Sequence, residues 1–79
     1  MKNGEALKTQ RLYRGMTQAV LAEKTGISVR VLQNFEQGVR DINRASVDAV
    51  LRISEALGCD VYDILNEREV RYLWEHDHE

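Results

Sequence analysis

Three polar side chains with forked hydrogen-bonding groups recur at helical spacing in one short segment of the sequence. Arg30 lies three residues before Gln33 and four before Asn34, and side chains at these separations share one face of a helix. Arginine, glutamine and asparagine are the side chains that pair with the edges of guanine and adenine in the major groove of DNA. Together with Val29 they form a candidate base-reading face. Ordinary solvent-exposed helix surface is the alternative interpretation.

The elements that would position this face are two short helices joined by a glycine turn. Thr17 is a candidate N-cap for a helix over residues 18–25, and Gly26 can adopt the left-handed conformation that ends it. Ser28 is placed to cap the next helix, residues 29–37. Because two helices this close must cross at a steep angle, their apolar residues are expected to point inward together. These residues are Leu21, Ile27, Leu32 and Phe35.

Further helical segments make the predicted fold all-α. They are residues 3–14 with Asn3 as cap, a helix that begins at Asn43 or Ser46 and ends at Gly58, and residues 61–65 with Asp60 and Asp63 as a capping box. The charged stretch 39–46 is expected to be an ordered surface loop. The residues that recur at core-facing spacing in these segments are Leu7, Leu12, Val47, Val50, Leu51, Ser54, Leu57, Val61, Ile64 and Leu65.

The length of 79 residues predicts one small domain with a thin core, because so short a chain buries only about 60% of its unfolded surface. The single cysteine, Cys59, has no internal disulfide partner and is expected to be a small buried hydrophobe. The sequence shows neither a secretory signal nor an apolar run of roughly 18 residues. A cytoplasmic protein without a membrane partner is therefore expected.

Charge is distributed unevenly along the chain, although the net charge is only −2. Residues 8–44 hold seven lysines and arginines against three carboxylates, whereas residues 45–79 hold three against nine. A basic half can face the phosphates of a nucleic acid while an acidic half points away, which would orient the protein during encounter. The alternative is solvated surface charge without a partner.

No catalytic or metal-binding constellation is recognisable. The sequence offers neither a nucleophile with a neighbouring base nor a glycine-rich phosphate loop. His76 and His78 are two positions apart and so fall on opposite sides of a helix, whereas metal-binding pairs on helices are usually four apart. A protein that is not an enzyme and has no metal or cofactor is therefore expected.

The segment LKTQRLYRGMTQAVLAEKTGISVRVLQNFEQG, followed by SVDAVLRISEALGCDVYDIL, resembles the lambda-repressor and Cro type of helix-turn-helix domain, also called the xenobiotic-response-element family. The likeness covers residues 5–66. Its most specific elements are Thr17-Gln18, Ala22 with Gly26, Phe35-Glu36-x-Gly38 and Ala56-Leu57-Gly58.

This resemblance implies a compact five-helix bundle over residues 5–66 that binds double-stranded DNA, as a homodimer on an inverted-repeat operator. Residues 67–79 would form a C-terminal extension that is partly helical or frayed. The resemblance places Arg11 and Glu36 in a structural ion pair between the first and third helices. The residues expected to contact the DNA backbone are Thr17, Gln18, Ser28, Gln37, Arg40 and Arg44.

Three positions depart from the family pattern. Gln10 and Thr25 stand where aliphatic residues are usual, and Val29 stands where the family often has a base-reading glutamine. A valine can instead contact the methyl group of thymine.

Three functions remain open from the sequence. The first is a sequence-specific transcriptional regulator, a repressor that acts by occupying its operator. The second is an antitoxin that regulates its own operon while a toxin binds the acidic half or the stripe formed by Val70, Leu73 and Trp74. The third is a protein-interaction adaptor that has the same bundle but has lost DNA binding.

Overall fold

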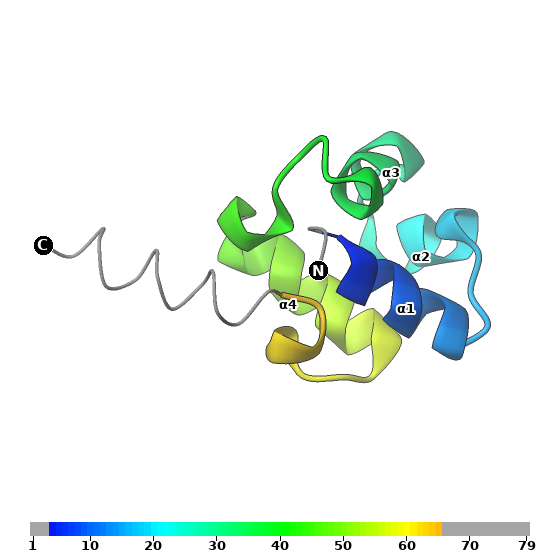
Figure 1. The fold of residues 1–79 in the computed structure, drawn as a ribbon. Helices are drawn as coiled ribbons and strands as arrows, with labels where there is room; N and C mark the ends of the chain where they lie inside the picture. Colours follow the sequence, from blue (N-terminus) through cyan, green and yellow to red (C-terminus); the bar gives the residue numbers. More distant parts are fainter. Residues whose placement is uncertain (1–3, 66–79) are drawn as a thin grey trace, which may run out of the picture.

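The computed structural model describes residues 4–65 and shows an all-α domain, as predicted (Figure 1). The predicted C-terminal extension and its candidate partner stripe lie outside the described residues. The elements are the helices α1 (Glu5–Tyr13), α2 (Gln18–Thr25), α3 (Val29–Gln37) and α4 (Val47–Leu57), with 3₁₀ turns at Ile42–Arg44 and Val61–Asp63. The prediction of a fifth α-helix is wrong, because the described residues after Asp60 form one 3₁₀ turn.

Hydroxyl side chains begin three of the helices, as expected from their positions. Thr17 Oγ1 accepts a hydrogen bond from the backbone N–H of Val20 at 3.1 Å, and Ser28 Oγ accepts one from Val31 at 3.2 Å. Ser46 caps α4 in the same way, so α4 starts after the later of its two predicted caps. A hydroxyl at this position satisfies one of the backbone donors that the first helical turn leaves without a partner.

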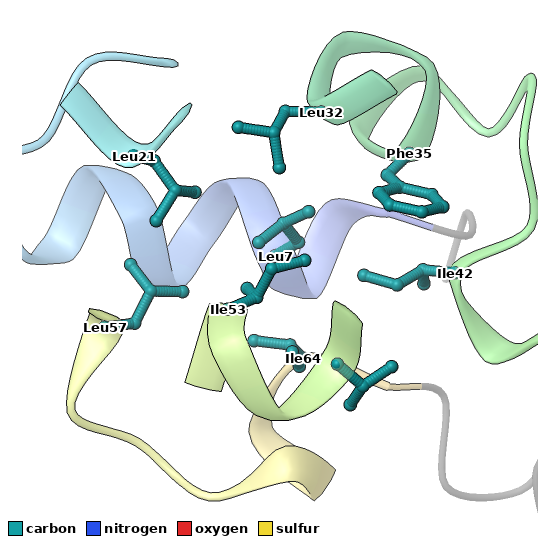
Figure 2. Packing of buried hydrophobic residues seen from close by; sticks show 9 residues of the cluster. Leu7, Leu21, Leu32, Phe35, Ile42, Ile53, Leu57 and Ile64 are labelled. Carbon is teal, nitrogen blue, oxygen red and sulfur yellow. The ribbon is translucent and has the colours of Figure 1, made fainter. Parts of the chain in front are cut away.

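In the described part of the chain, the core is a single cluster of nine buried apolar side chains (Figure 2). They come from α1, α2, α3 and α4 and from both 3₁₀ segments or their ends. Figure 2 shows Leu7 and Ile53 near the centre of this cluster, and Phe35 facing Ile42. Each such side chain contributes about 1.5–3 kcal/mol when it is fully buried. The members are Leu7, Leu21, Leu32, Phe35, Ile42, Val50, Ile53, Leu57 and Ile64.

Three predicted core residues are wrong. Leu12, Val47 and Leu51 are 57%, 75% and 47% exposed. Leu12 lies five positions after buried Leu7, which places the two on different sides of α1. Leu51 is turned about 100° from buried Val50. Val47 is the first residue of α4, and the buried residues of this helix begin only at Val50.

Two charged side chains are buried between α1 and α3. Arg11 Nε donates to Glu36 Oε2 at 2.8 Å and Arg11 Nη2 donates to Glu36 Oε1 at 3.0 Å, while Nη1 donates to the carbonyl oxygen of Met16 at 2.7 Å. Only 8% of Arg11 and 6% of Glu36 is exposed. The hydrogen bonds to Glu36 raise the pKa of Arg11 against the opposing effect of burial, so the guanidinium stays charged. The pair therefore fixes α1, the start of the turn before α2, and α3 to one another.

Thr25 also has a defined role in the interior. Its hydroxyl donates to the carbonyl oxygen of Leu21 at 2.8 Å and accepts from the backbone N–H of Ile27 at 3.1 Å. The hydroxyl thus closes the turn between α2 and α3, which an aliphatic residue could not do. Among the described residues, every buried side-chain nitrogen or oxygen has a hydrogen-bond partner.

The start of α1 packs directly against the backbone at the end of α3. Gly4, instead of the predicted Asn3, occupies the N-cap position, with φ of 91° and no side chain to form a cap. A Cβ atom added at Gly4 would overlap the backbone carbonyl oxygen of Phe35. Glycine is therefore required here both by its backbone conformation and by this close approach.

Replacing Gly4 tests this contact, and Gly15 supplies the matched control. Both have positive φ, but a Cβ at Gly15 would meet nothing within 4 Å. Gly15→Ala is expected to lower the free energy of unfolding by about 1 kcal/mol through backbone strain alone, and Gly4→Ala by about 3 kcal/mol because α1 must also move away from α3. Urea unfolding measures both. Equal losses of unfolding free energy in the two variants would show that the close approach does not affect stability.

A second prediction concerns the buried ion pair. Glu36→Gln keeps the shape of the side chain but leaves the Arg11 guanidinium without its counter-charge, so the free energy of unfolding is expected to fall by about 3 kcal/mol. Asp48→Asn is the control, because it removes an exposed i, i+4 pair in which Arg52 Nε lies 3.1 Å from the Asp48 carboxylate. That change is expected to cost less than about 0.5 kcal/mol. Similar losses in the two variants would contradict a structural role for the buried pair.

Candidate nucleic-acid interface

The candidate base-reading residues lie together on the side of α3 that faces away from the core. Leu32, Phe35 and Glu36 are the buried residues of this helix. Val29, Arg30, Gln33 and Gln37 are exposed, and Asn34 is half-buried beside them. Within residues 4–65, the side chains of Arg30 and Gln33 form no hydrogen bond or ion pair with the rest of the chain. Their donors and acceptors are therefore available to a partner.

Residues at the starts of α2 and α3 flank this surface. Thr17 and Ser28 are exposed, and each hydroxyl oxygen already accepts a backbone hydrogen bond as an N-cap, while its proton remains available for donation. Gln18 is half-buried, and its Nε2 donates to Glu36 Oε1 at 3.3 Å. The amide of Gln18 is thus attached to the buried ion pair. This bond connects the start of α2 to α3 through the carboxylate that also binds Arg11.

The loop after α3 brings two further arginines close to the helix. The backbone N–H of Arg40 donates to the carbonyl oxygen of Asn34 at 3.0 Å, which folds the loop back on α3. Arg44 is exposed and lies 3.7 Å from the carboxylate of Asp41. Both arginines line a hollow of about 590 Å³ between α3 and the start of α4. The apolar part of this lining comes from Ile27, Val31, Phe35, Ala45 and Ala49.

The residue that anchors this loop, Ile42, was not predicted from the sequence. Ile42 is only 1% exposed and packs in the core, although it stands alone among polar residues. The Asp41 carboxylate accepts from the backbone N–H of Asn43 at 3.0 Å and begins the 3₁₀ turn that directs Ile42 inward. An isolated isoleucine after an aspartate N-cap was the only local signal. The loop is therefore ordered, and it holds Arg40 and Arg44 beside α3.

Not all arginines of the basic half are free to meet a phosphate. Arg11 is buried with Glu36, and Arg14 Nη2 donates to the carbonyl oxygen of Gly58 at 3.2 Å. The guanidinium of Arg14 also lies 5.5 Å from the centre of the Tyr13 ring. The bonds to Glu36 and Gly58 join α1 to α3 and to the end of α4, whereas the contact with Tyr13 is local to the end of α1. The exposed arginines of residues 8–44 that remain near α3 are Arg30, Arg40 and Arg44.

Other chemistry has little support in the described part of the chain. Residues 4–65 contain no group of three histidine, cysteine or acidic side chains that could hold a metal ion. His76 and His78 lie outside the described residues. Burial, followed by the charge of Asp63, raises the pKa of the Cys59 thiol, which makes it a poor nucleophile at neutral pH. No helix in this part of the chain is long and apolar enough to cross a bilayer.

Comparison with known proteins agrees with this geometry. Among solved structures, the restriction-modification controller protein C.AhdI from Aeromonas hydrophila has a similar fold, with a TM-score of 0.70 and 24% identity over 78% of this chain and 89% of that chain. No sequence among the curated proteins matches. A helix-turn-helix family profile matches residues 7–64, which include α2, α3 and α4. The chain therefore belongs to the Cro/C1-type helix-turn-helix family of DNA-binding transcriptional regulators.

Proposed function

We propose that this protein is a sequence-specific repressor that inserts α3 into the major groove of double-stranded DNA. The observation that carries the proposal is the polar stripe on α3, whose Arg30 and Gln33 side chains are exposed and unpaired within residues 4–65. Forked side chains on a rigid helix suit base recognition because the helix fixes their spacing along the groove. Occupation of the operator would then exclude RNA polymerase.

The proposal divides the interface into base readers and backbone contacts. Val29, Arg30, Gln33 and Asn34 would face the base edges. The DNA backbone would be contacted from both flanks of α3, which fixes the register of the helix in the groove. These backbone contacts would come from Thr17, Gln18, Ser28, Gln37, Arg40 and Arg44.

A homodimer on an inverted repeat is part of this proposal. Two copies of α3 would have to lie about 34 Å apart to enter successive major grooves on one side of the duplex. Selection of bound duplexes from a random pool, followed by sizing of the complex, tests both the specificity and the stoichiometry. A symmetric motif bound by two chains is expected. If no duplex is enriched at low salt, the repressor proposal fails and the adaptor function replaces it.

Base-reading and backbone arginines should behave differently when they are removed. Arg30→Ala is expected to weaken binding to the selected operator by about 1–3 kcal/mol and to relax the preference at one base position. Arg40→Ala is expected to weaken binding to every duplex to a similar extent. Titrations of a set of single-base operator variants measure these effects. A uniform loss for Arg30→Ala would show that Arg30 contacts the backbone instead of a base.

Salt dependence separates the same two roles. Each phosphate neutralised by a protein cation releases counterions, so loss of one such contact reduces the slope of log K against log salt by about 0.9. Arg40→Ala is expected to show this reduction. Lys24→Ala is the control, because Lys24 is exposed and lies with Arg52 and Glu55 at the junction of α2 and α4. An unchanged slope for Arg40→Ala would remove Arg40 from the proposed backbone contacts.

A further inference from the structure

The proposed reading surface contains one side chain that cannot form a hydrogen bond. Val29 is the first residue of α3, is 36% exposed, and stands next to Arg30 and one helical turn before Gln33. The base-edge atoms that arginine and glutamine read are donors and acceptors, and valine can satisfy none of them. The C5-methyl group of a pyrimidine is the largest apolar group on a base edge in the major groove.

The position of Val29 is well defined by its surroundings. The Ser28 hydroxyl accepts from the backbone N–H of Val31 at 3.2 Å and so fixes the first turn of α3. Valine is branched at Cβ and strongly prefers one side-chain rotamer in a helix. Its two methyl groups are therefore held at a fixed place beside Arg30. Contact with another methyl group would cost little conformational entropy.

A second exposed valine shows that exposure alone does not define such a site. Val47 also follows a serine N-cap and is also the first residue of its helix, and it is 75% exposed. Its neighbour in sequence is Asp48, whose carboxylate would repel DNA, and the residue one turn later is Leu51. Val29 differs because it shares its helix face with Arg30 and Gln33, whose side chains are unpaired within residues 4–65.

We propose that Val29 is a specificity-determining residue that recognises the C5-methyl group of a pyrimidine, in thymine or in 5-methylcytosine. The inference rests on the proposed function, because it requires that α3 lies in the major groove. It adds a chemical class to the operator, in which a methylated pyrimidine lies beside the base that Arg30 contacts. The loss of affinity on removal of that methyl group depends on Val29.

The test uses the duplex selected from the random pool and replaces one thymine at a time by deoxyuridine, which removes only the methyl group. Wild-type protein is expected to bind about fourfold more weakly when the critical thymine of one half-site is replaced, which corresponds to about 0.8 kcal/mol for one buried methyl group. Binding is measured by fluorescence anisotropy at a fixed salt concentration. Equal affinities after every thymine and every cytosine replacement would overturn the proposal.

The cytosine replacements distinguish the two sources of the methyl group. Each cytosine of the duplex is replaced in turn by 5-methylcytosine, opposite an unchanged guanine. If the methyl group is read on thymine, one deoxyuridine replacement weakens binding, and no replacement of a cytosine by 5-methylcytosine changes the affinity. If it is read on 5-methylcytosine, one such replacement strengthens binding about fourfold, and no deoxyuridine replacement matters. Either pattern supports recognition of a C5-methyl group.

Two variants assign the effect to Val29. Val29→Ala is expected to lose most of the fourfold discrimination, because alanine lacks the two methyl groups that would make the contact. Val47→Ala changes the same residue type at the same helical position after the same N-cap, and it is expected to keep the full discrimination. Persistence of the effect in Val29→Ala would overturn the assignment. Failure of wild-type protein to select any duplex would instead remove the proposed function itself, so the two failures are distinguishable.

Discussion

The buried ion pair between Arg11 and Glu36 is the contact on which the arrangement of the helices depends. Burial of two charges is costly unless each is paired and its remaining hydrogen-bonding capacity is used. This requirement is met here, because Arg11 also donates to the carbonyl oxygen of Met16 and Glu36 also accepts from Gln18. Four hydrogen bonds with fixed directions thereby join α1, the start of α2 and α3. Apolar packing alone has no comparable directional preference.

The geometry around this pair has little freedom to adjust. Gly4 brings the start of α1 against the backbone of Phe35, and Ile42 anchors the following loop in the same core. The described residues include only nine buried apolar side chains, so they offer few contacts that could compensate for a shift of α3. The ion pair, the contact at Gly4 and the anchored loop together fix the position of α3, which carries the proposed reading surface. Its exposed side chains can then meet a partner without reorganisation of the fold.

Net charge is a poor guide to the surface of this protein. The chain carries a net charge of −2, yet among residues 4–65 three exposed arginines lie on or beside α3. Two other arginines of the basic half, Arg11 and Arg14, are used in contacts within the bundle. Glu36, a carboxylate on α3 itself, is buried and neutralised by Arg11. The exposed side of α3 is therefore more favourable to a polyanion than the composition indicates.

Local signals in the sequence were sufficient for the helix-turn-helix unit. The hydroxyl caps Thr17 and Ser28 and the left-handed Gly26 act within a few residues, so the bounds of α2 and α3 followed from their positions. The spacing of Val29, Arg30 and Gln33 likewise determined that they share one face. The family resemblance supplied the pairing of Arg11 with Glu36, which are 25 residues apart.

Only the tertiary structure decided which apolar residues are buried. Leu12, Val47 and Leu51 match a helical pattern but are exposed, whereas Ile42 matches none and is buried. Periodicity predicts which residues share a helix face, but it does not predict how far a neighbouring element covers that face. The close approach at Gly4 and the attachment of Gln18 to Glu36 depend on residues distant in sequence. Such contacts arise from the packing of whole helices, so the local sequence around each residue does not predict them.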